Sequence, residues 1–258
     1  MSAGEMVGKR VAVEDGLCER HGPFASRVIA PGVVLGCPAC LEEVRREQAA
    51  FAARARVENR YLDAGLPLGV QDVGLDNFKC AVREQRAAVA HARGFVECYR
   101  AGRNLILSGP AEGKTHLLVA VTKHIAARGA MVRYLNAADL LMAMTEVGYG
   151  RQSESAVLHC FVGPSLLVVD HVGDVHWTRY LRTLFLRVID ARCSAGLATA
   201  IASHTDVARL QDDIGERTLR RLWAHGNELV TLNQKIHRSG TALRSTAEFD
   251  RYLNPSKE

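Results

Sequence analysis

No apolar run in this sequence approaches the roughly 20 residues that a helix needs to cross a bilayer. The first residues also lack the basic stretch and apolar core of a secretory signal. We therefore expect a cytoplasmic protein without a membrane partner. The hydrophobic fraction of 48% and the charged fraction of 24% are ordinary for a soluble globular chain. A length of 258 residues suffices for one full core and a small accessory module.

Cysteine is sparse, and most of it is scattered. Four of the seven cysteines stand alone, as buried cytosolic thiols usually do, at Cys80, Cys98, Cys160 and Cys193. The other three lie near the N-terminus with a histidine, as a C-x2-H pair and a C-x2-C pair separated by 15 residues: Cys18, His21, Cys37 and Cys40. Two such turns complete the tetrahedron that Zn²⁺ prefers, and four protein ligands leave no open position. We therefore expect a structural zinc site. A disulfide cluster and free thiols are the alternatives, and a disulfide fits a reducing compartment poorly.

The zinc ligands belong to a small N-terminal module. Residues 25–30 and 33–35 flank Pro31-Gly32 and predict a short hairpin that brings the two ligand pairs together. From Leu41 to about Ala64 the pattern is helical and highly charged, and proline and glycine then interrupt it. We place the zinc-binding module and basic helix at residues 1–62, a linker at 63–78 and an ATPase domain at 79–258.

The net charge of +5 is modest, but arginines crowd two predicted helices. These are Arg45, Arg46, Arg54, Arg56 and Arg60 in the first helix, and Arg209, Arg217, Arg220 and Arg221 in the second. Such clusters suit a polyanion such as nucleic acid, although arginine-rich helices are often only solvated faces.

A glycine loop between an apolar run and a predicted helix carries the strongest functional signal. The expected nucleotide-binding residues are Ser108, Gly109, Pro110, Ala111, Glu112, Gly113, Lys114, Thr115 and His116, together with Asp170. Lys114 would contact the β- and γ-phosphates of ATP, and Thr115 would bind Mg²⁺. Asp170 ends the apolar run 165–169 and would be the second magnesium contact. A chance glycine turn is the alternative.

The loop is one residue short of the usual P-loop pattern. That pattern has four residues between its glycines, whereas Gly109 and Gly113 enclose three. At the usual spacing the first position is Ser108.

Strands and helices alternate around this loop. Strands are predicted at residues 104–108, 131–135, 165–169 and 197–202, and helices at 115–128, from 136, at 179–192 and at 213–225. Alternation of this kind predicts an α/β fold with a parallel sheet covered by helices on both faces.

Several motifs, in order, resemble those of the DnaC/IstB family of AAA+ proteins. Residues 103–117 are similar to its P-loop, 166–173 to its Walker B segment and 213–222 to its arginine-bearing segment. Residues 64–67 with 75–78 resemble the start of its ATPase domain. The N-terminal cysteines resemble the zinc-bearing N-terminus of DnaC-like helicase loaders. The similarity runs from about residue 18 to residue 240.

The resemblance implies an ATPase that loads or regulates a replicative helicase on single-stranded DNA and forms a homo-oligomer with ATP. Lys114 and Asp170 then serve catalysis, and Arg217 or Arg221 is a finger that reaches a neighbouring subunit's nucleotide. Arg238 is a weaker match to a second sensor arginine. An IstB-like transposition helper on duplex DNA and a nucleotide-binding scaffold without catalysis are the competing functions. A small-molecule kinase fares worst, because no second substrate site is visible.

Two histidines depart from the family pattern. His171 stands where a glutamate usually polarises the attacking water, and His204 follows the strand that usually ends in a polar sensor. With the short loop, these substitutions predict ATP binding with slow or absent hydrolysis. Asp174 is a carboxylate that could replace the glutamate, but the sequence alone does not place it.

Overall fold

The computed structural model describes residues 13–30, 33–34, 36–67, 69–70, 72–148, 153–224 and 227–232. Arg238 lies outside these residues. The chain divides into two compact units, Met1–Glu58 and Asn59–Glu258, and helix α1 (Pro38–Asp63) contains the boundary between them.

The N-terminal unit holds a small antiparallel sheet and most of α1. Its strands are β1 (Val13–Cys18), β2 (Gly22–Ala30) and β3 (Val33–Val34), in the order β1-β2-β3. Val28 pairs with Val34, so the predicted hairpin is present. The sequence did not predict β1, which pairs with β2 through a tight turn that ends at Gly22, where φ is +77°. Helix α1 has no buried residue among those described, as its charged pattern leads one to expect.

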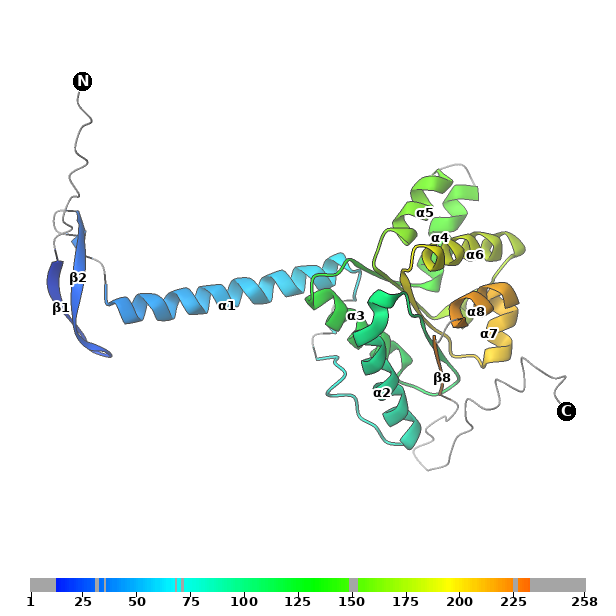
Figure 1. Ribbon diagram of the computed structural model, residues 1–258, viewed down its shortest axis with the longest axis horizontal. Coiled ribbons are helices and arrows are strands. Elements are labelled where there is room, and N and C mark those ends of the chain that lie inside the picture. The colour runs from blue at the N-terminus through cyan, green and yellow to red at the C-terminus, as the bar shows by residue number, and fades with distance from the viewer. Residues whose placement is uncertain are drawn as a thin grey trace, which may run out of the picture. The chain divides into compact units, whose positions relative to one another are not determined.

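The larger unit is built on a five-stranded parallel sheet (Figure 1). Its strands are β4 (Leu105–Ser108), β5 (Val132–Asn136), β6 (Leu166–Asp170), β7 (Ala198–Ala202) and β8 (Glu228–Thr231), in the order β5-β6-β7-β4-β8. The predicted α/β class is therefore confirmed. In such sheets, ligands bind beyond the carboxyl ends of the strands.

Helices cover both faces of this sheet. Helices α2 (Arg83–Cys98) and α3 (Lys114–Ala127) pack on one face. The other face carries α4 (Ala137–Gly148), α5 (Glu154–Val162), α6 (Arg179–Ser194), α7 (Val207–Ile214) and α8 (Glu216–Trp223). Successive strand residues alternate between the two cores: Leu107 faces α3, and Ile106 faces the other layer. The described part of the unit also contains two short 3₁₀ helices, η1 (Tyr99–Ala101) and η2 (Val172–Asp174).

The segment after α1 packs on the larger unit. Ala64, Leu66 and Leu75 are buried in the core beside α2 and α3. The Tyr134 N–H donates to the Ala64 carbonyl at 2.6 Å. At Gly65, φ is +81° and a Cβ would lie 2.6 Å from the Tyr134 carbonyl oxygen, so only glycine fits. The segment therefore runs along the edge strand β5.

One predicted helix differs in the structure. Instead of a single helix over residues 213–225, α7 ends at Ile214 and α8 begins at Glu216. Gly215 separates them with a φ of +90°, a backbone conformation incompatible with a continuous helix.

Candidate nucleotide-binding site and metal centre

The glycine loop joins the buried strand β4 to the start of α3. Both of its glycines have positive φ, +113° at Gly109 and +102° at Gly113. A Cβ on Gly113 would lie 2.7 Å from the ring of Phe78, so a side chain there would collide as well as strain the backbone. The first N–H groups of α3 lack partners within the helix and carry the positive end of its dipole. This is the geometry that attracts a phosphate.

The neighbouring strand ends hold the shortened loop in place. The Gly109 N–H donates to the Thr205 carbonyl at 2.8 Å, and the Ala111 N–H donates to the Leu232 carbonyl at 2.9 Å. The Ser108 hydroxyl also donates to the Thr205 carbonyl, at 2.7 Å. These bonds use the Gly109 and Ala111 amides and leave the amides around Gly113 and the start of α3 as the ones that could hold a phosphate.

Lys114 is buried within the loop. Its Nζ donates to the Gly109 carbonyl at 2.6 Å and to the Ala111 carbonyl. Burial lowers the pKa of Lys114, and the carboxylates of Asp170, Asp174 and Glu112 act in the opposite direction. The ammonium group is thus preorganised beside the loop, where a phosphate would exchange with the two carbonyls.

Asp170 lies at the end of β6 with an exposed fraction of 2%. The Tyr134 hydroxyl donates to Oδ2 at 2.9 Å, and the His171 N–H donates to Oδ1 at 2.8 Å. Each oxygen keeps a lone pair, so this carboxylate and the exposed Thr115 hydroxyl at the start of α3 offer the hard oxygen ligands that Mg²⁺ prefers. Tyr134 was missed from the sequence, where its only signal is a hydroxyl-bearing side chain between Arg133 and Leu135 in a predicted strand.

His171 and His204 both reach Asp174. His171 Nδ1 lies 2.7 Å from Asp174 Oδ2, and His204 Nδ1 lies 2.6 Å from Asp174 Oδ1. The fold therefore brings together the two histidines that depart from the family pattern and the carboxylate that the sequence left unplaced.

The candidate finger arginines lie on α8. Both pair with Asp190 of α6: Arg221 Nε at 2.8 Å and Arg217 Nη2 at 3.5 Å. The Arg217 side chain is 78% exposed and that of Arg221 43%, so both remain accessible to another subunit. Arg220 instead pairs with Glu216 on its own helix, at 2.6 Å.

His116 faces the segment that precedes α2. Its Nε2 lies 3.0 Å from the Gly74 carbonyl oxygen, and its ring meets Phe78 edge-to-face at 4.9 Å. Phe78 in turn covers Gly113. His116 and Phe78 thus fasten this segment to the glycine loop.

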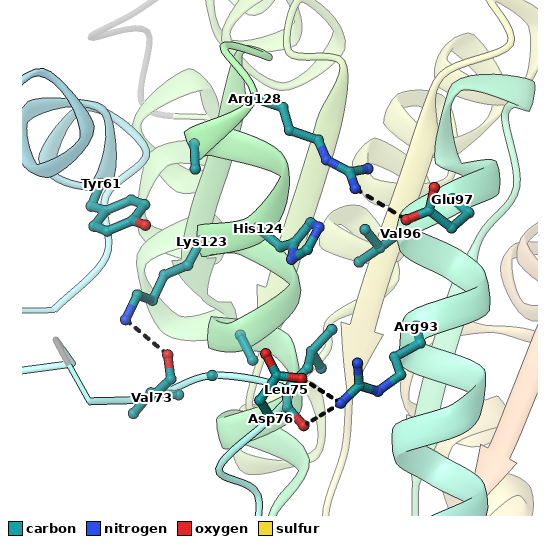
Figure 2. Close-up of a pocket in the computed structure, with 13 residues that line it drawn as sticks. Tyr61, Val73, Leu75, Asp76, Arg93, Val96, Glu97, Lys123, His124 and Arg128 are labelled. Carbon is teal, nitrogen blue, oxygen red and sulfur yellow. Dashed lines mark hydrogen bonds and ion pairs between the residues drawn. The ribbon is translucent and has the colours of Figure 1, made fainter. Parts of the chain in front are cut away.

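A cavity of about 500 Å³ lies beside the second half of α3 (Figure 2). Lys123 donates to the Val73 carbonyl at 2.8 Å, and Arg93 of α2 pairs with Asp76 at 2.6 Å. Among the described residues that line it, none is a predicted nucleotide ligand. The cavity is therefore separate from the loop, and its polar contacts hold the segment that leads to Phe78.

The four predicted zinc ligands converge in the N-terminal unit. Their ligand atoms all lie within 4.8 Å of one another. His21 Nδ1 lies 3.6 Å, 3.7 Å and 3.3 Å from the sulfurs of Cys18, Cys37 and Cys40, and the Cys18 and Cys40 sulfurs are 3.6 Å apart. A tetrahedral zinc spaces sulfur and nitrogen ligands roughly 3.3–3.8 Å apart, whereas a disulfide needs about 2.0 Å. The cluster fits a metal and not a disulfide.

The surroundings of the cluster also suit a metal. Hydrogen bonds from the backbone of Arg20 and His21 lower the pKa of Cys18 to about 6, which favours the thiolate that binds metal. Hydrogen bonding with Cys18 raises the pKa of Cys40 to about 11, because two neighbouring thiols do not both ionise without a cation. On the far side of the ring, His21 Nε2 lies 3.2 Å from Glu43 Oε1. A carboxylate in that position fixes the ring so that Nδ1 faces the sulfurs.

Together, the parallel sheet, the glycine loop before α3 and the aspartate that ends β6 define an ATP-binding α/β protein of the AAA+ class. Comparison with known families is more specific. The chain belongs to the family of IstB-like ATP binding proteins, whose model matches residues 35–243.

Curated relatives include replicative helicase loaders. The chain is 26% identical to the replicative helicase loader DnaC of Escherichia coli K12 over 172 residues, which are 66% of this chain and 70% of that protein. It is also 26% identical to the DnaC of Buchnera aphidicola subsp. Schizaphis graminum over 215 residues, 82% of this chain and 80% of the relative.

Solved structures share the fold. A crystal structure of the DnaC helicase loader matches with a TM-score of 0.56 and 23% identity, over 65% of this chain and 100% of that one. The replication initiator DnaA bound to AMPPCP and single-stranded DNA matches with a TM-score of 0.56 and 22% identity, over 64% and 51%. In the part of the chain that the structure describes, no helix is long and apolar enough to span a membrane.

Proposed function

We propose that this protein is an ATP-binding AAA+ protein of DNA replication that loads or regulates a replicative helicase on single-stranded DNA. The observation that carries the proposal is the sequence similarity to replicative helicase loaders, which extends over 82% of the chain in one relative. The cysteine–histidine cluster and the glycine loop support the proposal, because they correspond to the zinc-binding module and the nucleotide-binding domain expected of such a loader.

ATP is proposed to bind along the loop Ser108–His116. Lys114 would exchange its two loop carbonyls for phosphate oxygens, and the amides at the start of α3 would hold the same phosphates. Thr115 and Asp170 would hold Mg²⁺, which neutralises phosphate charge when bound.

The zinc-binding module is proposed to face the helicase. With Cys18, His21, Cys37 and Cys40 all bound to zinc, the module would present a rigid surface rather than a reactive metal. The exposed arginines of the ATPase unit would contact the DNA backbone, whose negative charge attracts them without reading sequence.

A homo-oligomer would complete the site. The exposure of Arg217 and Arg221 on α8 supports a finger that acts on the nucleotide of a neighbouring subunit. Asp190 would hold the two guanidinium groups in place until the subunits meet.

Membership of the IstB-like family motivates one alternative. An IstB-like protein that assists transposition would share the ATPase core and would assemble on duplex DNA. A nucleotide-binding scaffold without hydrolysis is a further alternative, motivated by the histidines at positions 171 and 204.

These functions separate in a binding experiment. The full-length, zinc-loaded protein is mixed with the replicative helicase encoded by the same genome, and complexes are measured by size-exclusion chromatography with light scattering. ATP, ADP and no nucleotide are compared, with single-stranded and duplex DNA. The proposal predicts a helicase complex that depends on ATP and prefers single-stranded DNA. Absence of helicase binding would contradict it, and ATP-dependent filaments on duplex DNA would favour the transposition alternative.

A further inference from the structure

Asp174 is bound by two imidazoles that come from different parts of the chain. His171 precedes it in the turn after β6, and His204 follows the end of β7. Because an ionised carboxylate only accepts hydrogen bonds, the Nδ1 of His171 donates to Asp174 Oδ2. The imidazole of His204 lies against the other carboxylate oxygen, Oδ1. The side chains of His171, His204 and Asp174 are about half exposed (54%, 55% and 47%), so water reaches this carboxylate.

The turn that carries Asp174 is rigid. Val172 is fully buried, and its carbonyl accepts a hydrogen bond from Trp177 Nε1 at 2.9 Å. A Cβ on Gly173 would lie 2.5 Å from Ser203 Oγ, so the turn packs directly against the end of β7. His171 adopts a φ of +59°, which is uncommon for a residue other than glycine and which aims its ring at Asp174. Asp174 is therefore held in a set position.

Three carboxylates act electrostatically on Lys114, those of Asp170, Asp174 and Glu112. Asp170 is buried, receives hydrogen bonds at both oxygens and is the magnesium ligand of the proposed function. Glu112 is exposed on the loop itself. Asp174 alone among the three combines access to water with close contacts to two imidazoles, a hydrogen bond from His171 and an ion-pair contact with His204.

From this arrangement we propose that Asp174 is the catalytic base for ATP hydrolysis and that His171 and His204 are its positioning residues. The inference deepens the proposed function and rests on it. Asp174 accepts a hydrogen bond from the water that attacks the γ-phosphorus. As the new oxygen–phosphorus bond forms, the bond to the β–γ bridging oxygen breaks and its electron pair leaves with ADP. The proton of the water passes to Asp174 and then to solvent. His171 and His204, which depart from the family pattern, thus position Asp174, the carboxylate that takes the place of the usual glutamate.

The test measures ATP turnover and the binding of a fluorescent ATP analogue on the full-length, zinc-loaded protein, with saturating single-stranded DNA. Asp174→Asn is expected to lower kcat by roughly 100-fold or more and to leave nucleotide affinity within about twofold. Asp174→Glu keeps the carboxylate and is expected to retain more turnover than Asp174→Asn. His204→Asn and His171→Asn are expected to lower kcat by roughly tenfold with little change in KM, because they misplace the base without touching ATP.

The matched control is Asp212→Asn, which removes an exposed carboxylate from α7 and is expected to turn over ATP as the wild type does. Asp174→Asn with wild-type kcat would overturn the inference and make the cluster a structural brace. Wild-type protein that binds ATP without any turnover would also overturn it, while leaving ATP binding intact. Absence of ATP binding would contradict the proposed function itself, and the inference with it.

Discussion

At the scale of single residues, Asp170 shows how the sheet prepares a buried charge. A carboxylate that is 2% exposed needs hydrogen-bond donors, and Tyr134 supplies one from the neighbouring strand β5. Burial, together with the negative charge of Asp170, raises the pKa of the Tyr134 hydroxyl. The hydroxyl therefore stays protonated, and continues to donate, throughout the neutral range. In the proposed site, this partner would hold Asp170 in one orientation toward Mg²⁺.

The substitution Tyr134→Phe tests this partnership. It removes the hydroxyl that donates to Asp170 Oδ2 and leaves that buried oxygen without this hydrogen bond. The free energy of unfolding should therefore fall by about 1–3 kcal/mol. The Mg²⁺ concentration for half-maximal ATP binding should rise by about tenfold. Chemical denaturation and a magnesium titration measure the two effects. Tyr180→Phe, at an exposed position on α6, is the control; equal behaviour of the two variants would show that the hydrogen bond has no role.

The zinc ligands give a second prediction at this scale. Protein purified without chelator should contain one zinc per chain, and Cys40→Ser should lose it because one of the four ligands is gone. Cys80→Ser lies outside the cluster and should keep its zinc. Metal content is measured by plasma mass spectrometry. Wild-type protein without zinc, or Cys40→Ser with a full complement, would contradict the assignment.

At the scale of elements, the glycine loop depends on the segment before α2. Phe78 covers Gly113 and meets His116, while Lys123 and Arg93 hold the same segment to α3 and α2. The loop conformation is therefore supported from outside the β4–α3 connection.

Gly113→Ala should disrupt this support. The new Cβ would lie 2.7 Å from the Phe78 ring, and the alanine would have to adopt a φ of +102°. We therefore expect the free energy of unfolding to fall by about 1–3 kcal/mol and ATP binding to weaken. Gly74→Ala is the matched control, because its Cβ meets only Asn77 Oδ1 at an ordinary 3.6 Å. Thermal unfolding and nucleotide titration compare the two. A Gly113→Ala protein as stable as Gly74→Ala would rule out the collision.

The sequence predicted those elements whose pattern is local. Strands β4, β6 and β7 are continuous apolar runs because both faces of the sheet are covered, and the glycine loop and cysteine pairs have fixed spacings. Strand β1 was missed because Glu14, Asp15 and Gly16 hide its pattern. Strand β8 was missed because only two of its residues, Leu229 and Val230, are apolar. The Asp174 cluster was beyond reach, because His204 meets it only once β6 and β7 are paired. The break between α7 and α8 could have been predicted, because Gly215 is a glycine inside a helical pattern.

At the scale of the whole molecule, one compact unit carries the cysteine–histidine cluster and the other carries the ATP-binding fold of the family. The net charge of +5 and the exposed arginines on α8 favour an anionic partner or a neighbouring nucleotide. For ATP to control how the proposed adaptor binds its partner, ATP must bind one conformation of the protein more tightly than another. A nucleotide site and a partner-binding module are both needed for this.

The finger assignment is tested in the assembled protein. Arg217→Ala or Arg221→Ala should lower turnover by about 1,000-fold with nucleotide binding retained, because the finger stabilises charge only in the transition state. Arg220→Ala removes a third arginine from the same helix, one that pairs within α8, and should behave as the wild type. Turnover is measured above the concentration at which light scattering shows assembly with ATP. Unchanged turnover in both Arg217→Ala and Arg221→Ala would exclude a finger on α8.

The most direct test of the whole account is calorimetric titration of the full-length, zinc-loaded protein with ATP and Mg²⁺. Wild-type protein should bind one ATP per chain. Lys114→Ala should bind at least about tenfold more weakly, because a charge-assisted contact to phosphate is lost. Lys79→Ala removes an exposed lysine outside the loop and should bind as the wild type does. Absence of binding to the wild type, or equal affinity in all three proteins, would contradict an ATP site at the start of α3.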